Sequence, residues 1–450
     1  MPVRPNFRRL ARFVSVFAAV VGLAVAPGCV TRPLARISVQ ELPAAQRERA
    51  EQNLRVFNAV WDLVNRRHYD PRTRGPEWER EAATFGPRAA AAPDEKALYL
   101  VLNEMLELLH DSHTHALTPE QSAERRTRER ARTGFSMSRV EDRWVVTDVL
   151  PDSPAGRAGV MAGWIVLLRN GEPLGRRPDF RASEGEEVRW RFLDAQDRVI
   201  DLPVKATRLS IAPLQVERAL PGGFVYLRFD GFDAKDRRWL GARLRAHEDA
   251  PGVVIDLRRN SGGETFSLGI SLGEFFDHAV EWGTFIDREG ARKAKSSWQL
   301  GSAHYHGRVI VLVDESSASA AEIFAAVLQD QGRATVVGRR TAGAVLASWF
   351  YRLPGGGTLQ LSREDYLTPG GRRLEGAGVA PDVSVTRSLA DARAGRDPDL
   401  EAALAILRTP QAPARRTSNL DTSLQQPGAL VLSVRLPARH GFALRIPAEK

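Results

Sequence analysis

Short apolar strands alternate with helices through the middle of the chain, and this alternation strongly limits the folds available to it. Runs rich in Val, Ile and Leu predict strands at 225–229, 253–257 and 309–313. Helical patterns follow at 235–247, 265–276 and 320–331. Because repeated strand–helix units bring parallel strands together, we predict a layered α/β core with at least some parallel pairing.

A chain of 450 residues is too long for one ordinary hydrophobic core, so further domains are expected. Apolar residues recur at helical spacing before residue 110, and short alternating strands separated by turns follow them. The predicted regions are a helical region at 46–132, a β domain at 133–208, the α/β core at 209–408 and a tail at 409–450. The charged segment 120–132 is predicted to be a linker.

The N-terminus has the pattern of an export signal. Four arginines precede an uncharged apolar run, 13–26, which is shorter than the roughly 20 residues that span a bilayer. The only cysteine, Cys29, follows small residues, where a bacterial lipoprotein signal is cleaved and acylated. We therefore expect a signal at 1–28, a tether at 29–45 and a membrane anchor on Cys29. The alternative is a plain signal peptide with an incidental cysteine. Val30, the residue after Cys29, favours the outer membrane as the membrane that holds the anchor.

The charge of the chain gives little support to nucleic-acid binding. The formal net charge is +9, but four of the positive charges belong to the N-terminal arginines. The other arginines are dispersed among acidic residues, and no dense basic block with interleaved aromatic residues is present. With a single cysteine, no disulfide can form within the chain, so core packing must hold the fold.

Two turns of the α/β core have the residues that a nucleophilic site needs. Ser319 lies between a predicted buried strand and a helix, where free N–H groups and the helix dipole can stabilise an oxyanion. A serine at a helix start is, however, most often a cap. The segment 256–263 ends in two glycines between a strand and a helix, which lets backbone N–H groups approach a ligand. It lacks the Gly-Lys-Ser/Thr ending of a phosphate loop.

Together these motifs resemble the C-terminal processing peptidases and the tricorn core proteases, over residues 57–407. A third matching motif runs from 366 to 382. The resemblance implies a catalytic core similar to the ClpP and crotonase folds. It also implies a nucleophile at Ser319, with the backbone N–H groups of Ala320 and Gly263 as the oxyanion hole.

The β domain resembles a PDZ domain. Its Ser153-Pro154-Ala155 segment and the later Asn170-Gly171 turn carry this resemblance, although Gly163-Trp164 replaces the usual Gly-Asp. A generic small β domain is the alternative. The resemblance implies a loop that captures a peptide C-terminus through backbone N–H groups, formed by the following residues: Gly134, Phe135 and Ser136.

The sequence departs from the tail-specific branch of this family at the general base. That branch has a lysine about 25 residues after the serine, but Ala344 stands here, and no lysine lies between Lys295 and Lys450. Alanine cannot accept a proton. The tricorn-like branch instead uses a Ser-His-Thr motif and a late glutamate. Resemblance to it implies His113 as the base, with Ser112 and Glu375 assisting.

Several alternatives stay open from the sequence. His110, His113 and His115 could bind a metal, although the zinc-protease pattern His-Glu-x-x-His is absent. His115 could replace His113 as the base, and Glu375 could be an ordinary surface carboxylate. The leading hypothesis is a serine endopeptidase that cleaves extended polypeptides and needs no metal or cofactor. An inactive ligand-binding lipoprotein of the same fold and a PDZ adaptor are the rivals, and no oligomeric state is predicted.

Overall fold

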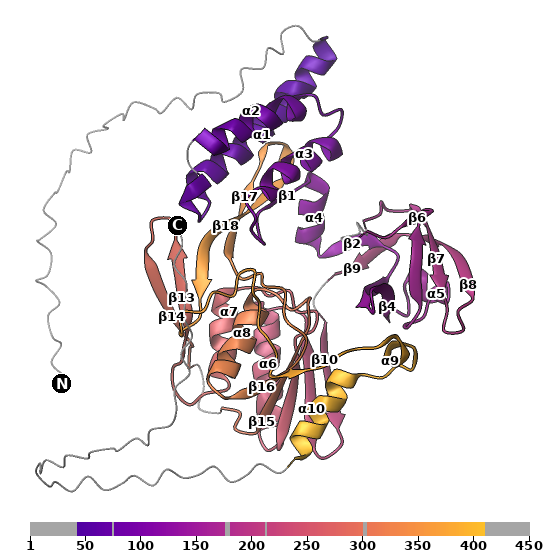
Figure 1. Cartoon of the computed structure of the whole chain (residues 1–450), viewed down its shortest axis with the longest axis vertical. Helices are drawn as coiled ribbons and strands as arrows, with labels where there is room; N and C mark the ends of the chain where they lie inside the picture. The colour runs from indigo at the N-terminus through magenta and orange to yellow at the C-terminus, as the bar shows by residue number, and fades with distance from the viewer. Residues whose placement is uncertain (1–42, 74–75, 176–180, 212–213, 300–303, 410–450) are drawn as a thin grey trace, which may run out of the picture. The chain divides into compact units, whose positions relative to one another are not determined.

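The structure is a computed structural model that describes residues 43–73, 76–175, 181–211, 214–299 and 304–409 (Figure 1). The expected export signal, Cys29 and most of the C-terminal tail therefore lie outside the described residues. No helix in the described part of the chain is long and apolar enough to cross a membrane.

The N-terminal region consists of helices, as the apolar spacing predicts. They are α1 (Ala44–Arg67), the short 3-10 helix η1 (Pro71–Thr73), α2 (Pro76–Ala90) and α3 (Glu95–Glu107). The buried side chains of Phe57, Val60 and Trp61 lie four or fewer residues apart on α1 and pack with Leu102 of α3. Leu359, from a strand far along the chain, belongs to the same cluster, so this region is anchored to the later part of the chain.

The prediction of a linker at 120–132 is wrong. This segment forms α4 (Pro119–Thr127) and β2 (Glu129–Arg132). The Thr118 hydroxyl accepts a hydrogen bond from the Gln121 N–H (3.2 Å), and the Gln121 side chain accepts one from the Thr118 N–H (3.1 Å). This capping box, with Pro119 in the first turn, gives a charged segment a defined helix start.

Residues 133–208 fold around their own small core. The strands are β3 (Phe135–Val140), β4 (Arg143–Val149), β5 (Ile165–Arg169), β6 (Glu172–Pro173), β7 (Glu187–Leu193) and β8 (Val199–Lys205), with the short helix α5 (Pro154–Arg157). The main sheet has the order β3-β4-β5-β7-β8, so β3 lies at its edge. Trp190 and Phe192 fill the core. A two-stranded ribbon of β2 and β9 (Thr207–Ser210) flanks the domain.

The α/β core is built on a six-stranded sheet with the order β10-β11-β12-β15-β16-β19. Its strands are β10 (Gln215–Leu220), β11 (Phe224–Phe229), β12 (Gly252–Asp256), β15 (Arg308–Val313), β16 (Ala334–Gly338) and β19 (Val383–Ser384). All neighbours are parallel except β10 and β11. The parallel pairing predicted from the strand–helix alternation is confirmed.

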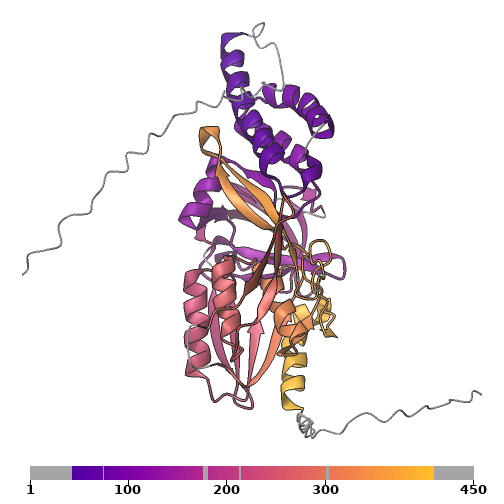
Figure 2. The same cartoon turned by 90° about the vertical axis from the view of Figure 1, so that its left-hand side faces the viewer.

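Helices cover both faces of this sheet (Figure 2). The helices are α6 (Ala234–Ala246), α7 (Thr265–Gly273), α8 (Ala320–Asp330), α9 (Leu389–Arg393) and α10 (Pro398–Arg408). Along β11, Leu227 and Phe229 pack with α6, α7 and α8, whereas Phe224 and Tyr226 pack with α10 on the opposite face. A strand buried on both faces explains why its sequence is apolar without alternation.

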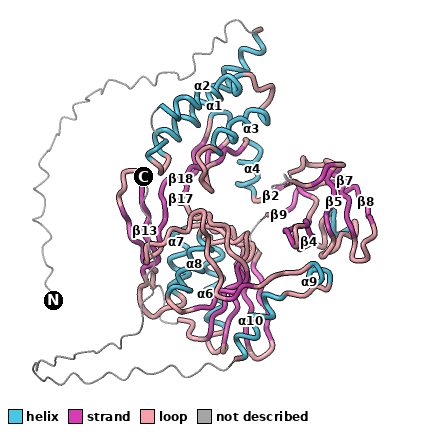
Figure 3. Tube along the Cα trace, viewed as in Figure 1, coloured by secondary structure: helices cyan, strands magenta, loops and turns pink. Residues whose placement is uncertain are grey.

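A second sheet connects the helical region to the core (Figure 3). It has the order β1-β18-β13-β14, and β17 pairs with part of β18. Its strands are β1 (His115–Leu117), β13 (Glu281–Asp287), β14 (Arg292–Ser296), β17 (Ala347–Arg352) and β18 (Thr358–Leu367), and the 3-10 helix η2 (Pro354–Gly356) joins β17 to β18. The fold class expected from the sequence, α/β with an N-terminal helical region, a small β domain and a layered core, is confirmed.

Candidate active site

Ser319 lies in the sharp turn between β15 and α8, as the sequence predicts. Its backbone has φ 57° and ψ −120°, a conformation that non-glycine residues rarely adopt. In nucleophile elbows, a strained turn from a strand to a helix holds a serine hydroxyl exposed at the top of a sheet. The turn at Ser319 has the same order of elements.

The double glycine lies directly beside this turn. A Cβ atom at Gly262 would stand 2.6 Å from Ser319 Cβ and 2.8 Å from Ala320 N, so only glycine fits. Within the described residues, neither the Gly263 N–H nor the Ala320 N–H donates a hydrogen bond to a protein acceptor. Both donors are therefore free to bind a negatively charged oxygen. The oxyanion hole that the resemblance implies for these two residues stays a prediction.

Asn260, which sequence reasoning passed over, joins the two turns. Its carbonyl accepts a hydrogen bond from the Ala318 N–H (3.0 Å), and its side-chain oxygen accepts one from the Gly262 N–H (2.9 Å). The amide nitrogen donates to the Phe229 carbonyl (2.9 Å), and Asn260 is fully buried. The Asn260 carbonyl thus joins the glycine turn to the serine turn, while its side chain holds the glycine turn against the end of β11. The only signal for Asn260 in the sequence was its position within the segment 256–263.

Glu322 was also missed. Its side chain is fully buried and accepts hydrogen bonds from the N–H groups of Ser319 (3.1 Å), Gly343 (2.7 Å) and Ala344 (2.8 Å), and from the Thr341 hydroxyl. Burial raises the pKa of Glu322, although these hydrogen bonds act in the opposite direction. The carboxylate ties the start of α8 to the segment in which Ala344 replaces the family's lysine. Its place three residues after Ser319, as in a capping box, could have revealed it.

Ser112, His113 and Glu375 come together although more than 260 residues separate them. The Ser112 hydroxyl lies 2.7 Å from His113 Nδ1 and donates a hydrogen bond to Glu375 Oε2 (3.1 Å). The Ser112 N–H donates to Glu375 Oε1 (3.1 Å). Burial raises the pKa of Glu375, while hydrogen bonds from Val345 and Ser112 lower it. Glu375 is therefore no isolated surface carboxylate.

A short segment links this group to the nucleophile turn. The Ser319 N–H donates to the Ala344 carbonyl (2.8 Å), and the next N–H along the chain, that of Val345, donates to Glu375 Oε2 (2.9 Å). No hydrogen bond joins the Ser319 hydroxyl to the His113 ring among the described residues. Catalytic hydrogen bonds are often long without substrate and tighten when it binds, so this geometry does not exclude the pair.

Asp111 holds the backbone of the histidine segment in place. Its carboxylate accepts hydrogen bonds from the N–H groups of His113 (2.9 Å) and Thr114 (2.7 Å), and it lies 2.7 Å from His68 Nε2. Burial would raise the pKa of Asp111, but the bonds from His68 and Thr114 outweigh it and lower the pKa to about 2. His68 is buried, and its contact with the Asp111 carboxylate is structural. The role of Asp111 could not be recognised from the sequence.

The three clustered histidines have different positions. His113 precedes β1, and burial lowers its pKa. His115 lies within β1 opposite Gln360, and burial lowers its pKa as well. His110 has a positive φ of 51° in the turn after α3. No group of three His, Cys, Asp or Glu side chains within the described ranges is arranged to hold a metal ion.

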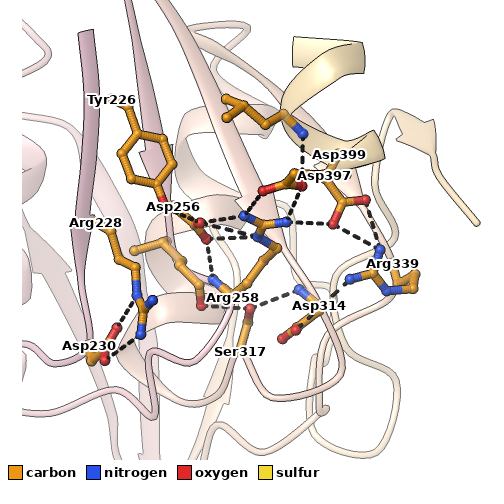
Figure 4. A network of polar contacts seen from close by, with 12 residues as sticks. Tyr226, Arg228, Asp230, Asp256, Arg258, Asp314, Ser317, Arg339, Asp397 and Asp399 are labelled. Carbon is orange, nitrogen blue, oxygen red and sulfur yellow. Dashed lines mark hydrogen bonds and ion pairs between the residues drawn. The ribbon is translucent and has the colours of Figure 1, made fainter. Parts of the chain in front are cut away.

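A network of ion pairs lies behind the glycine turn (Figure 4). The Arg258 guanidinium contacts Asp256 (2.7 Å), Asp397 (2.7 Å) and Asp399 (2.9 Å), and Arg339 contacts Asp399 from the other side (2.8 Å). Burial works against the charge of Arg258, but the neighbouring carboxylates outweigh it and raise its pKa well above the ordinary range. The network ties the strand end before the glycine turn to the start of α10.

The expected carboxylate-binding loop lies at the start of β3. Gly134 has a φ of 101°, and its carbonyl accepts a hydrogen bond from the Leu150 N–H (2.9 Å). Phe135 and Ser136 already belong to β3 and lie opposite residues of β4. Asp148 of β4 also forms an ion pair with Arg259 of the glycine turn (2.7 Å), so the β domain contacts the candidate site directly.

Several known proteins are similar to this chain in sequence. A sequence model of peptidase family S41 matches residues 223–385. The chloroplastic carboxyl-terminal-processing peptidase 3 of Arabidopsis thaliana is 26% identical over 85% of this chain and 78% of that protein. The carboxyl-terminal-processing protease of Synechocystis sp. is 26% identical over 86% of this chain and 93% of that protein. The carboxyl-terminal-processing protease of Picosynechococcus sp. is 29% identical over 79% of this chain and 89% of that protein.

Solved structures show the same fold. The photosystem II D1 C-terminal processing protease matches with a TM-score of 0.55 and 22% identity, covering 80% of this chain and 97% of that one. The fold and the relatives together define a serine-type peptidase. The predicted resemblance to the C-terminal processing peptidases is confirmed, because residues 223–385 match the model of peptidase family S41 and carboxyl-terminal-processing proteases are similar to most of the chain.

Proposed function

We propose that the chain is an exported endopeptidase that cleaves extended or unfolded polypeptides through an acyl-enzyme on Ser319, with His113 as the general base. The observation that carries this proposal is the hydrogen-bonded chain from His113 Nδ1 through the Ser112 hydroxyl to Glu375. This arrangement is similar to a catalytic triad, in which a carboxylate orients the histidine that activates the serine.

The hydrogen bonds of Ser112 define the protonation state of His113 that the proposal requires. When Glu375 is ionised, its carboxylate only accepts, so the Ser112 hydroxyl donates to it. Ser112 Oγ then accepts a hydrogen bond from the protonated Nδ1 of His113, which leaves the Nε2 lone pair of His113 free. This lone pair takes the proton of the Ser319 hydroxyl as the serine attacks the scissile carbonyl.

The remaining steps follow from the donors beside Ser319. The N–H groups of Ala320 and Gly263 stabilise the oxyanion of the tetrahedral intermediate. The imidazolium of His113 then protonates the leaving amine, which leaves the acyl group on Ser319. A water molecule then attacks the acyl group while His113 takes its proton. His113 returns this proton to Ser319 Oγ, so the acid product leaves and the free serine is restored. Through Ser112, Glu375 stabilises the imidazolium and raises the basicity of the ring.

The pH dependence of kcat/KM tests this role of His113. Only the neutral imidazole can accept the proton, and burial lowers the pKa of His113 below 6.5. Activity should therefore be full at neutral pH and fall as pH drops through the lowered pKa. Chelators should leave the rate unchanged. Glu375→Gln should lower kcat/KM by roughly 10- to 100-fold, less than loss of the base.

A rate profile with no acidic limb near or below pH 6.5 would contradict the assignment of a histidine base. His115→Ala is the matched control, since burial also lowers the pKa of His115. Its profile should coincide with that of the wild-type protein.

We further propose that the β domain binds substrate as PDZ domains do, through Gly134, Phe135 and Ser136. PDZ domains bind an extended peptide as an added strand on an exposed sheet edge. This proposal is supported by the position of β3 at the edge of its sheet. The ion pair between Asp148 and Arg259 provides a direct contact through which a bound peptide could act on the glycine turn.

We also propose that the protein is a lipoprotein of the bacterial cell envelope, anchored by Cys29 and held in the outer membrane. The support is the basic, apolar and small-residue pattern before Cys29. Cys29→Ser should abolish incorporation of labelled fatty acid and move the protein from the detergent phase to the aqueous phase. Equal labelling and partition of both forms would refute the anchor. Ser319→Ala serves as the control, because it should partition like the wild type.

A further inference from the structure

A row of side chains crosses the second sheet beside the candidate site. Gln360 of β18 pairs with His115 of β1 on one side and with Phe350 of β17 on the other. Residues directly opposite one another in neighbouring strands share a face, so these three side chains lie on the same face. Ser348 lies there too, since its hydroxyl accepts a hydrogen bond from the Gln360 amide (2.8 Å). His115 is two residues from His113, so this face adjoins the catalytic group.

The guanidinium of Arg125 lies over this face and has no ion-pair partner among the described residues. The Arg125 guanidinium of α4 lies 3.5 Å from the centre of the Phe350 ring. Among the described residues, no carboxylate lies within ion-pair distance of Arg125. Phe350 itself is 41% exposed, which is high for a large apolar side chain in a strand. A cation and an aromatic ring are thus both available to a ligand.

The outer edge of β17 is open. No other described strand pairs with it on the side away from β18. The Leu353 N–H donates to the Gly357 carbonyl (2.9 Å) at the end of the hairpin. Since hydrogen-bonded pairs alternate along antiparallel strands, Tyr351 and Trp349 bond to β18, whereas the main-chain groups of Phe350 and Ser348 point to the open edge. An extended peptide can add to such an edge as a further strand.

The same strand leads directly to the nucleophile. Three residues before β17 begins, the Ala344 carbonyl accepts the Ser319 N–H, and Val345 contacts Glu375. A peptide that runs along β17 therefore continues toward Ser319.

We propose that this face of β17 is a substrate subsite that binds an extended polypeptide and holds one of its carboxylates on Arg125. The proposal rests on the proposed peptidase function for the identity of the ligand. The open edge of β17 binds the peptide backbone, Phe350 contacts an apolar side chain, and Arg125 selects an acidic side chain or a C-terminal carboxylate nearby. Arg is suited to this because its planar guanidinium stacks on a ring while its N–H groups bind a carboxylate.

Peptide binding to the Ser319→Ala protein tests the subsite without requiring turnover. The probes are short fluorescein-labelled peptides of Ala and Val with one Glu at successive positions, each paired with its Gln counterpart, and with a free or amidated C-terminus. Fluorescence anisotropy gives the dissociation constants. For at least one position, or for the free C-terminus, the charged form should bind about tenfold more tightly than its neutral counterpart.

Arg125→Gln should remove this preference, and Arg126→Gln, a change at the next exposed arginine, should keep it. Phe350→Ala should weaken all the peptides, whereas Trp349→Ala, on the opposite face of β17, should not. Equal effects of the two arginine variants, or no preference for a carboxylate in the parent protein, would overturn the proposal. Because binding is measured on Ser319→Ala, a failure of catalysis by the wild-type protein would not affect this result.

Discussion

Ser319→Ala and His113→Ala are each expected to lower kcat/KM by about 10³-fold or more, with the double variant little worse than either single one. Ser319 is a weak nucleophile until a base takes its proton, and His113 cannot act without a nucleophile to activate. Residues that act as one unit are therefore strongly non-additive. Initial rates on an unfolded protein substrate, measured for the three variants in parallel, give the comparison.

His115→Ala is the control for this prediction. His115 resembles His113 in burial and lies two residues away, but it belongs to β1 and forms no hydrogen bond with Ser112 or Glu375 in the part of the chain that is described. It should keep most of the wild-type activity. Full activity of His113→Ala, or loss of activity in His115→Ala alone, would show that the base lies elsewhere.

Arg258→Met is expected to destabilise the core by about 3 to 5 kcal/mol and to abolish most activity. Arg258 is the cation that pairs with buried Asp256, and removing one partner of a buried ion pair leaves an uncompensated charge. The Ser317 hydroxyl donates to the Leu257 carbonyl (2.9 Å), so a shift of this strand end also moves the nucleophile turn. Chemical denaturation followed by circular dichroism measures the loss.

The matched control is Arg191→Met in the β domain. Arg191 forms an ion pair with Asp201 that is exposed to solvent, and such pairs contribute little to stability. The denaturation midpoint of this variant should stay that of the wild type. A comparable loss of stability in both variants would mean that the buried network has no special role.

Much of the fold could be predicted from local sequence patterns. The strands around 225–229, 253–257 and 309–313 are marked by apolar runs, and their helices begin at or within one residue of the predicted starts. The charged composition of segment 120–132 predicts a linker, whereas the capping residues Thr118 and Gln121 start a helix there. A solvated helix is as charged as a linker, so charge alone cannot distinguish them.

The contacts that position the residues of the candidate site could not be predicted in the same way. Contacts between Ser112 and Glu375 join residues 263 positions apart, and the contact between Arg258 and Asp399 spans 141 positions. Neither carboxylate has a local pattern that names its partner, because only the folded chain brings them together. Resemblance to a family suggested Glu375, whereas Asp111, Asn260 and Glu322 appeared only in the structure.

The most direct test of the central claim is labelling of the purified mature protein with a fluorophosphonate probe, followed by mass spectrometry of the modified peptide. We expect a single modified residue, Ser319. Labelling should be slowed strongly by His113→Ala and should be normal in His115→Ala. Modification at Ser316 or Ser317 would show that the nucleophile is a different serine. No labelling of a folded wild-type protein that binds peptides would refute the peptidase function and favour a non-catalytic binding protein of the same fold.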